Sequence, residues 1–408
     1  MFQNRWFSTL GTSRKDFLVV FILLFNAFTW YYITILIIDA YVQALNITST
    51  TAVTIWITYY VAVITSSVIG SIISNVKRLP VLYAWMLLGT VSSLLHALPF
   101  IPPLVWSFAL GFSLGVGLPI ALSFFADYSA IENRGRLSGI IFLTFSLAAA
   151  LLAIAFNTVN LTTGLVLFTL WRGAGLLAFA LLKPKENINL EKRKQVSFAQ
   201  ILKDKSLRLY LIPWIIFILI DRSTWLVFGN QFLKNPSLNS AIIFGPIIGS
   251  FSAFFGGFLA DRIGRKSVVI GGFVSLGLAY ALLGIAPEGI PLFWYLYIAV
   301  DGIAWGILLA TFLLTLWGDL SQFGGREKYY VIGGTPYYFT SIIESVLTSY
   351  VVEIPPYATF SLASFFLFLA VIPLLYAPET LPEKKIEIRR LKGYIEQARK
   401  IREEYAPS

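Results

Sequence analysis

The chain has 408 residues, of which 57% are hydrophobic and only 13% are charged. That charged share is about half of what an ordinary soluble domain carries, and it is too small to cover the surface of a soluble chain of this length. With no cysteine and one histidine, disulfides and thiolate chemistry are excluded, and a zinc cluster has too few ligands. Composition also argues against collagen-like and disordered classes. We therefore expect an integral membrane protein without metal or cofactor.

Long apolar runs fill most of the sequence. A helix that crosses a bilayer needs about 20 mostly apolar residues, and breaks with Pro, Gly and Asn separate most of the runs. The fold class predicted is all-α, with twelve transmembrane helices. The spans are expected at 17–39, 51–74, 80–99, 101–125, 137–157, 163–182, 209–231, 240–260, 267–286, 291–317, 329–351 and 357–377.

The distribution of Lys and Arg predicts the orientation of these spans, because cytoplasmic loops carry the excess of positive charge. With both termini in the cytoplasm, 28 of the 31 basic residues fall in cytoplasmic segments. Arg172 and Arg222 lie within spans, and only Lys234 falls outside. We expect a multi-pass protein of the cell membrane whose net charge of +10 faces anionic lipid, with no nucleic-acid partner.

The spans divide six and six around the polar stretch 183–208, in which 197–207 is expected to form a short interfacial helix. Landmarks recur between the halves at nearly one offset: Asp127 and Arg134 return 192 residues later as Asp319 and Arg326. This spacing indicates a duplication. The predicted domains are an N-terminal six-helix bundle at 1–182, a cytoplasmic linker at 183–208, a C-terminal bundle at 209–378 and a cytoplasmic tail at 379–408.

The segment after the eighth span carries the most specific motif, a glycine pair followed by Asp-Arg-x-Gly-Arg-Lys. Its residues are Gly256, Gly257, Asp261, Arg262, Gly264, Arg265 and Lys266. Glycine at 257 allows close helix contact and glycine at 264 allows a tight turn, whereas an ordinary basic loop explains only the charges. The segment resembles the signature loop of the major facilitator superfamily, which implies two pseudo-symmetric six-helix bundles around a central solute site.

Other segments extend this resemblance toward the sugar-porter and metabolite–proton symporter branches. Asp127 and Arg134 resemble the acidic-x6-Arg-Gly motif after span four, and Pro378-Glu379-Thr380 resembles the segment that closes span twelve. Together with the signature loop, the residues assigned to a cytoplasmic gate are Asp127, Arg134, Asp319 and Arg326. The first-half counterpart of the loop has Ser74 and Asn75 where Asp and Arg are expected, so we expect a weakened ion lock there.

Ionisable residues at membrane depth are costly and therefore mark candidate functional positions. Five such residues occur, and in this superfamily spans 1, 4, 7 and 10 line the cavity. Aromatic and polar residues that share helix faces with them, together with two on span one, complete the candidate set. The candidate substrate and proton residues are Asn26, Trp30, Asp221, Arg222, Trp225, Asp301, Trp305, Tyr337 and Glu344. The fifth buried charge, Arg172, lies on the peripheral sixth span and is interpreted as structural.

We hypothesise that Asp221 or Asp301 binds and releases a proton, with Arg222 as its ionic partner or as a site for an anionic solute. The competing interpretation is a permanent Asp–Arg pair that only fixes helix packing. The predicted function is a monomeric secondary transporter of a small solute, proton-coupled, with a sugar or small organic acid as substrate. Alternatives are a drug exporter or a non-transporting sensor of the same fold. A membrane-embedded enzyme is disfavoured because no acidic cluster for a metal is present.

Overall fold

The computed structural model describes most of the chain apart from short gaps and the two ends. The described residues are 12–44, 47–73, 78–95, 98, 100–185, 196–234, 238, 244–285, 290–321, 324–351 and 355–382, with isolated positions beyond 386. Within these ranges every regular element is a helix. The all-α prediction is confirmed.

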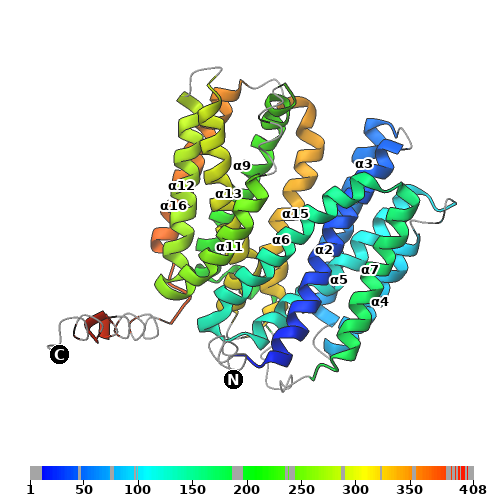
Figure 1. Ribbon diagram of the computed structural model, residues 1–408, viewed down its shortest axis with the longest axis horizontal. Coiled ribbons are helices and arrows are strands. Elements are labelled where there is room, and N and C mark those ends of the chain that lie inside the picture. Colours follow the sequence, from blue (N-terminus) through cyan, green and yellow to red (C-terminus); the bar gives the residue numbers. More distant parts are fainter. Residues whose placement is uncertain are drawn as a thin grey trace.

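Two groups of helices stand side by side (Figure 1). The first group consists of α2 (Arg14–Ala44), α3 (Ser49–Ile73), α4 (Arg78–Leu95), α5 (Pro103–Tyr128), α6 (Arg134–Thr158) and α7 (Leu161–Leu181). The second consists of α9 (Lys205–Lys234), α11 (Phe244–Ile263), α12 (Arg265–Ile285), α13 (Pro291–Leu309), α15 (Arg326–Val351) and α16 (Pro356–Tyr376). A π-helical turn, η3 (Ala310–Thr315), and α14 (Leu316–Leu320) continue α13 without a break.

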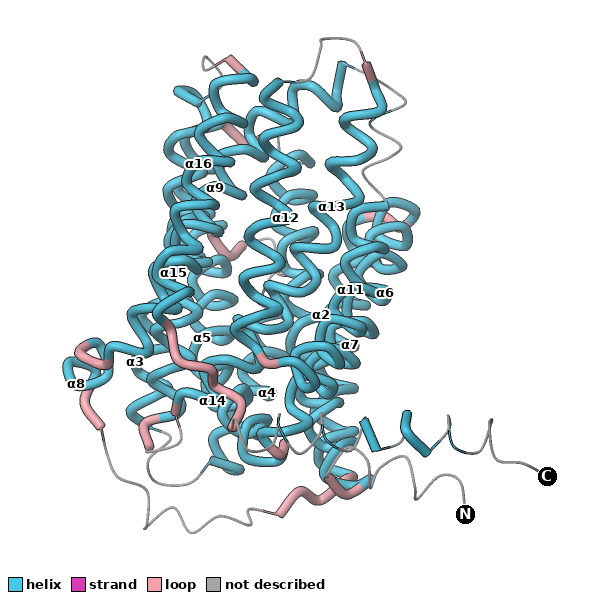
Figure 2. The backbone as a smooth tube through the Cα atoms, turned by 90° about the vertical axis from the view of Figure 1, so that its left-hand side faces the viewer, coloured by secondary structure: helices cyan, strands magenta, loops and turns pink. Residues whose placement is uncertain are grey.

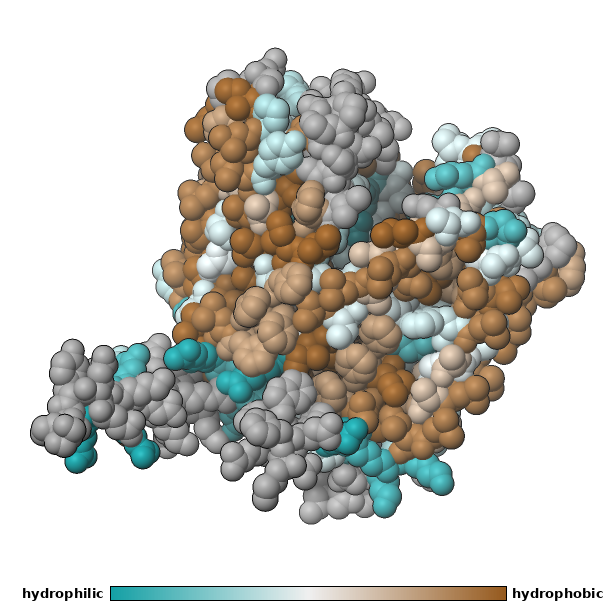
Figure 3. Space-filling view, in the orientation of Figure 1, coloured by the Kyte–Doolittle hydropathy of each residue, from teal (hydrophilic) through white to brown (hydrophobic). Residues whose placement is uncertain are grey.

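The lengths and surfaces of these helices suit a bilayer. Eleven of the described helices are long and apolar enough to cross a membrane, and α15, with 26 residues, is the remaining long helix. Large apolar side chains such as Leu181 and Phe100 are about four-fifths exposed, and Figure 3 shows apolar surface over both groups. Lipid rather than water matches such a surface, so the prediction of twelve helices in two six-helix bundles is confirmed.

The two bundles meet along α3 with α15 and along α6 with α11. They converge at the end that holds the α5–α6, α11–α12 and α14–α15 connections, which we call the basic end, and they diverge at the opposite end, the open end (Figure 1). Glycine allows the closest approach: a Cβ at Gly257 of α11 would stand 2.1 Å from the Gly135 carbonyl oxygen of α6. The contact at the basic end is therefore backbone against backbone.

The connection between the bundles is described only in part, because 186–195 lie outside the described residues. A short helix, α8 (Phe198–Leu202), starts at a capping box formed by Ser197 and Gln200 and buries Ile201. Figure 2 shows α8 at the basic end. It is shorter than the expected 197–207 helix because Asp204 accepts from the amide of Ser206 at 2.9 Å and α9 begins at Lys205.

Candidate functional site

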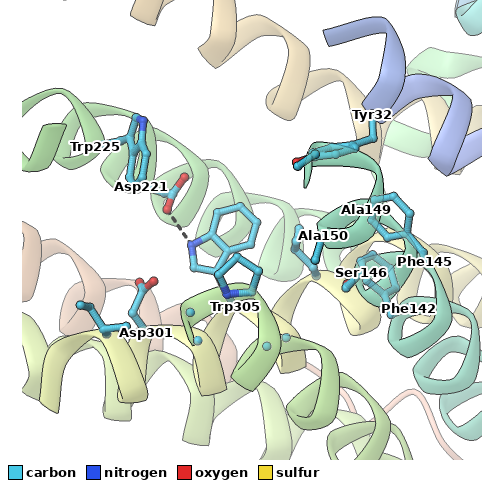
Figure 4. Close-up of a pocket in the computed structure, with 18 of the residues that line it drawn as sticks. Tyr32, Phe142, Phe145, Ser146, Ala149, Ala150, Asp221, Trp225, Asp301 and Trp305 are labelled. Carbon is cyan, nitrogen blue, oxygen red and sulfur yellow. Dashed lines mark hydrogen bonds between the residues drawn. The ribbon is translucent and has the colours of Figure 1, made fainter. Parts of the chain in front are cut away.

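A cavity of about 700 Å³ lies between the bundles. Its first wall consists of one residue of α2 and a face of α6, and its second wall consists of residues of α9, α11 and α13. Most of the lining side chains are aromatic, aliphatic or small, and Figure 4 draws 18 of the lining residues and labels ten of them. The labelled residues are Tyr32, Phe142, Phe145, Ser146, Ala149, Ala150, Asp221, Trp225, Asp301 and Trp305.

Two carboxylates lie on the second wall of this cavity. Asp221 of α9 accepts a hydrogen bond from the indole nitrogen of Trp305 at 2.6 Å, and Asp301 of α13 accepts from the hydroxyl of Tyr297 at 3.0 Å. Among the described residues, no Lys or Arg nitrogen lies within ion-pair distance of either carboxylate. The cavity therefore holds two acidic groups that form no ion pair within the described part of the chain.

The hydrogen bonds of Asp301 continue into the second bundle. The hydroxyl of Tyr297 lies 3.1 Å from that of Tyr280, which in turn lies 2.8 Å from the hydroxyl of Thr224. Both tyrosines are almost fully buried. This chain joins α13, α12 and α9, so it fixes the position of Asp301 relative to the helix that carries Asp221.

The arginine of α9 does not pair with either of these acids. Arg222 forms an ion pair of 3.2 Å with Glu344 of α15 and stacks at 4.9 Å over the ring of Tyr337. The expected ion pair of Arg222 with Asp221 or Asp301 is thus not formed in this conformation, although the charges of Arg222 and Asp221 still interact. Successive residues of a helix point about 100° apart, so Asp221 faces the cavity and Trp305 while its neighbour Arg222 reaches α15.

Asn26 and Trp30 belong to the interior of the first bundle and not to the cavity lining. The Asn26 amide donates to the Trp171 carbonyl at 3.0 Å, and the Trp30 indole donates to Ser93 at 3.0 Å. The residue of α2 that does line the cavity is Tyr32, two positions further along and thus on another face of the helix. Trp225 and Trp305 both line the cavity, as expected from the sequence. Tyr337 and Glu344 are not among the lining residues and contact Arg222 instead.

The wall that α6 contributes was not expected from the sequence. Ser146, Ala149, Ala150 and Ala153 all line the cavity. Their spacing of three and four residues places them on one helix face. A stripe of small residues on the fifth span is the sequence signal that points to this wall, because small side chains leave room between two helices.

Arg172 lies in the interior of the first bundle and is fully buried. Its guanidinium is sandwiched between the rings of Trp30 and Trp85, at 4.7 and 4.4 Å, and donates to the Asn26 side-chain oxygen at 2.8 Å. No carboxylate pairs with it among the residues that the structure describes. Stacking on two aromatic faces supplies the stabilisation that a counter-ion would otherwise give.

An ion cluster at the basic end, the second-half cluster, joins the two bundles. Asp319 pairs with Arg134 of the first bundle and, at 3.1 Å, with Arg265. Asp261 pairs with Arg265 at 2.9 Å and accepts from the amides of Gly135 and Arg136 at 3.0 and 2.9 Å. Its carboxylate thus caps the start of α6, where helix amides attract negative charge. The second-half cluster holds the basic end closed.

The rest of the signature loop has separate tasks. Gly264 adopts a φ of +108°, which favours glycine, and the following amides of Arg265 and Lys266 donate to Glu379 at 2.9 and 3.1 Å. Glu379, of the predicted Pro-Glu-Thr segment, therefore caps the start of α12. Arg262 is exposed and has no ion-pair partner in the described part of the chain.

The first half carries an equivalent cluster, the first-half cluster. Arg78 pairs with Asp127 and with Glu327 of the second bundle, while Arg326 of the second bundle also pairs with Asp127. Ser123 donates to Glu327 at 3.0 Å. Ser74 and Asn75 lie outside the described residues, so the weakened lock expected there stays a prediction. Glu327 supplies the first-half cluster with a second carboxylate from the opposite bundle.

Comparisons with known proteins agree with this geometry. The family model for the Major Facilitator Superfamily matches residues 19–312, and a search among curated proteins finds no match. Similar solved structures include the proton:xylose symporter XylE, with a TM-score of 0.74 at 14% identity, covering 90% of this chain and 97% of that chain. They also include the Escherichia coli fucose:proton symporter FucP, with a TM-score of 0.70 at 13% identity and coverages of 89% and 98%.

A third similar structure is the human organic anion transporter MFSD10 (TETRAN), with a TM-score of 0.66 at 17% identity, covering 88% of this chain and 99% of that chain. Identities this low carry the fold and not the substrate. The family match spans well over half of the chain and includes the first bundle, the second bundle as far as α13, the residues that line the cavity, and the signature loop. This chain belongs to the Major Facilitator Superfamily.

Proposed function

We propose that the protein is a secondary active transporter, coupled to protons, that moves a small organic solute across the cell membrane by alternating access. The solute undergoes no chemical conversion. One chain contains both bundles and the cavity between them, so a monomer is sufficient. The two ends of the molecule would open in turn as the bundles rock about the site.

One observation carries this proposal: a solute-sized cavity lies between two bundles that are joined at one end by ion pairs beside a close backbone contact. Arg134–Asp319, Arg78–Glu327 and Arg326–Asp127 each join one bundle to the other. Ion pairs and hydrogen bonds can separate into water without exposing a hydrophobic core, so this contact is suited to opening and closing. The described conformation is closed at the basic end.

The basic end would face the cytoplasm, together with both termini. Positive residues concentrate there, in the loops and in the linker between the bundles, and cytoplasmic loops carry such an excess. The described conformation would then be closed to the cytoplasm. Single cysteines at Lys15 and Thr50, in a chain that has none of its own, would test this orientation by labelling with impermeant reagents from one side.

The two unpaired carboxylates support proton coupling. An ionised carboxylate at membrane depth is costly unless a positive group neutralises it, and neither Asp221 nor Asp301 forms an ion pair among the described residues. A proton can fill this role in one step of the cycle and leave in another. The groups that face Asp301 are Tyr297 on its own helix, Tyr280 on α12 and Asp221 on α9.

The solute class is the least constrained part of the proposal. XylE and FucP are described as sugar:proton symporters and MFSD10 as an organic anion transporter, and the sequence motifs resemble the same branches. A sugar or small organic acid is thus the first candidate. The second candidate is an apolar amphiphile, as in drug export, because aromatic and aliphatic side chains dominate the cavity.

Proton flux in proteoliposomes tests the proposal. A thermal-shift screen against a metabolite library first selects binding solutes, and a trapped pH-sensitive dye then reports proton movement with each solute. We expect Asp301→Asn to lower pH-gradient-driven uptake at least tenfold at solute concentrations that saturate binding. Asp39→Asn is the matched control, since Asp39 is exposed near the open end of α2 and outside the cavity.

Two results would contradict parts of the proposal. Undiminished gradient-driven uptake by both Asp301→Asn and Asp221→Asn would exclude these acids from coupling. Solutes that bind with no flux in either direction, under any gradient, would instead indicate a sensor with a transporter fold.

A further inference from the structure

We propose that the cavity selects monovalent organic cations with a bulky apolar body. The inference rests on the proposed function, whose central site it specifies, and it departs from the sugars and organic acids that the sequence motifs suggest. It is based on the charges, the aromatic surfaces and the engaged hydrogen-bonding groups of the cavity lining.

The charges of the lining favour a cation. Three ionisable groups with a formal charge at neutral pH line the cavity: Asp221, Asp301 and Arg222. The Arg222 charge is already balanced by Glu344 at 3.2 Å, whereas the two aspartates have only neutral donors, an indole and a phenol. Although the charge of Arg222 also acts on Asp221, three carboxylates share this one arginine, so the net charge of the group is negative. An anionic solute would meet two carboxylates and an arginine that is already paired.

Aromatic faces supply the second element of recognition. Trp225 is half-exposed and lines the cavity in the turn after Asp221, and Trp305 lines it in the turn after Asp301. Figure 4 shows the two indoles on the same wall as the carboxylates. An organic cation is attracted to such ring faces as well as to the acids, and its apolar substituents match the rings and alanines. A small inorganic cation would use only the carboxylates.

The polar groups of the cavity are poorly arranged for a sugar. The Trp305 indole is bound to Asp221, and the Tyr297 and Thr224 hydroxyls are bound within the second bundle. Among the described lining residues, the hydroxyls of Ser146 and Tyr32 are the ones that form no such hydrogen bond and so remain available to a solute. Sugars need many directed hydrogen bonds, whereas a cavity of about 700 Å³ with few of them suits a drug-sized apolar molecule.

The same carboxylates would serve both the solute and the proton. A bound organic cation neutralises an aspartate directly, and its release leaves that aspartate free to take up a proton. Solute and proton would therefore compete for one site, which is the condition for exchanging them in opposite directions across the membrane. The inference thus also gives the proposed coupling a direction: exchange rather than co-transport.

Tetraphenylphosphonium and tetraphenylborate test the charge preference, because the two ions share shape and size and differ in sign. Binding to the purified protein in detergent is measured by calorimetry and by quenching of tryptophan fluorescence. We expect tetraphenylphosphonium to bind at least tenfold more tightly than tetraphenylborate. Equal affinities, or tighter binding of the anion, would overturn the inference.

Variants locate the binding. We expect Asp221→Asn/Asp301→Asn to lower the affinity for tetraphenylphosphonium at least tenfold and Trp225→Leu to lower it three- to tenfold. Asp39→Asn, the same change outside the cavity, should leave the affinity unchanged. Each variant must keep the gel-filtration profile and melting temperature of the wild type; if the double variant does not, the single Asp301→Asn replaces it. Unchanged affinity in folded cavity variants would also overturn the inference.

The two proposals can fail separately. If tetraphenylphosphonium does not bind but another solute moves with protons in proteoliposomes, the cation preference is wrong and the transport function stands. If tetraphenylphosphonium binds in the cavity but no solute is moved under any gradient, the binding site stands and the transport function is wrong.

Discussion

The two halves of the molecule build the same ion cluster from equivalent positions. Arg78 and Arg265 are 187 residues apart, and each pairs with the aspartate that follows the fourth span of its own half, Asp127 or Asp319. Each aspartate also pairs with an arginine of the other half, Arg326 or Arg134. The duplication indicated by sequence offsets is thus repeated in the pairing pattern, and both clusters contribute to closing the basic end.

The two clusters differ in which segment of the chain supplies their second carboxylate. In the second-half cluster it is Asp261, on the signature loop itself. The corresponding first-half residue is Ser74, and the carboxylate comes instead from Glu327, which stands 192 residues after Gly135. The acid has moved from one side of the contact to the other, so each cluster keeps two acids and two equivalent arginines. The second-half cluster adds a third arginine, because Arg136 lies 3.6 Å from Asp261. The duplicated halves therefore share the pairing pattern of two acids with two arginines rather than the loop motif.

The halves also differ at membrane depth. The second half carries Asp221, Arg222, Asp301 and Glu344, three of which line the cavity. The first half carries Arg172, stacked between two indoles away from the cavity, and contributes Tyr32 and a face of α6 to the lining. One half therefore supplies the ionisable groups and the other a mostly neutral wall. The following changes would break or sharpen these contrasts.

The largest expected effect is that of Arg265→Ala. Arg265 is fully buried and pairs with Asp261 and Asp319, and it also donates to the Ala260 and Ile131 carbonyls. Its loss should cost about 3–5 kcal/mol of stability because buried acids lose their partner. Thermal unfolding in detergent measures this loss.

Arg262→Ala, in the same loop, is the matched control for Arg265→Ala, and we expect it to change stability by less than about 0.5 kcal/mol. Arg78→Ala should cost less than Arg265→Ala, since Arg78 Nε has no partner among the described residues. An equal or larger cost for Arg78→Ala would show that the first-half cluster is the stronger of the two.

Glu327→Gln tests whether this residue replaces the missing loop acid. It removes the charge that pairs with Arg78 and should weaken the inter-bundle contact by about 1.5–3 kcal/mol. Spin labels on cysteines at Thr50 and Leu292, at the open ends of the two bundles, should then report a larger population with shorter distances as the basic end opens.

A second variant makes the Glu327 test more specific. Ser74→Asp, placed 187 residues before Asp261, should restore part of the wild-type distance distribution in the Glu327→Gln background. Asp39→Asn should leave the distribution unchanged. If Glu327→Gln also has no effect, the second acid of the first-half cluster is dispensable.

Gly257→Ala tests the backbone contact that underlies the second-half cluster. A Cβ there would stand 2.1 Å from the Gly135 carbonyl oxygen, so α6 and α11 must separate. We expect a loss of about 1–3 kcal/mol from overpacking and a shift toward an open basic end. Gly271→Ala is the control, because nothing lies within 4 Å of its Cβ. Equal spin-label distributions for the two variants would contradict the close-contact role.

The sequence was sufficient for the fold and only partly so for the site. Apolar run length and the position of positive charge depend on the bilayer and not on tertiary detail, so they predicted the twelve helices. The direction of a side chain depends on tertiary packing, so the sequence predicts it only in part. The residues that line the cavity as expected are Asp221, Asp301, Trp225 and Trp305. Asn26 was expected there only because the first span lines the cavity in the superfamily, whereas its side chain points toward α7.

Partner choice was the least predictable feature. Arg222 is adjacent to Asp221 in sequence, yet it reaches Glu344, 122 residues away. Glu327 lies in the second half, yet it completes the first-half cluster. Both pairs depend on how the bundles are packed, and no periodicity in one helix encodes that packing.

The smallest expected effect concerns Arg172, the charge that the first half carries at membrane depth. Arg172→Lys keeps the charge but loses the planar group that stacks on Trp30 and Trp85, and it should cost about 1–2 kcal/mol. Melting temperature should fall by a few degrees while tetraphenylphosphonium affinity stays within twofold of the wild type, because Arg172 is outside the cavity. An affinity change comparable to that of Asp301→Asn would mean that the first bundle also takes part in solute recognition, and the division of labour between the halves would fail.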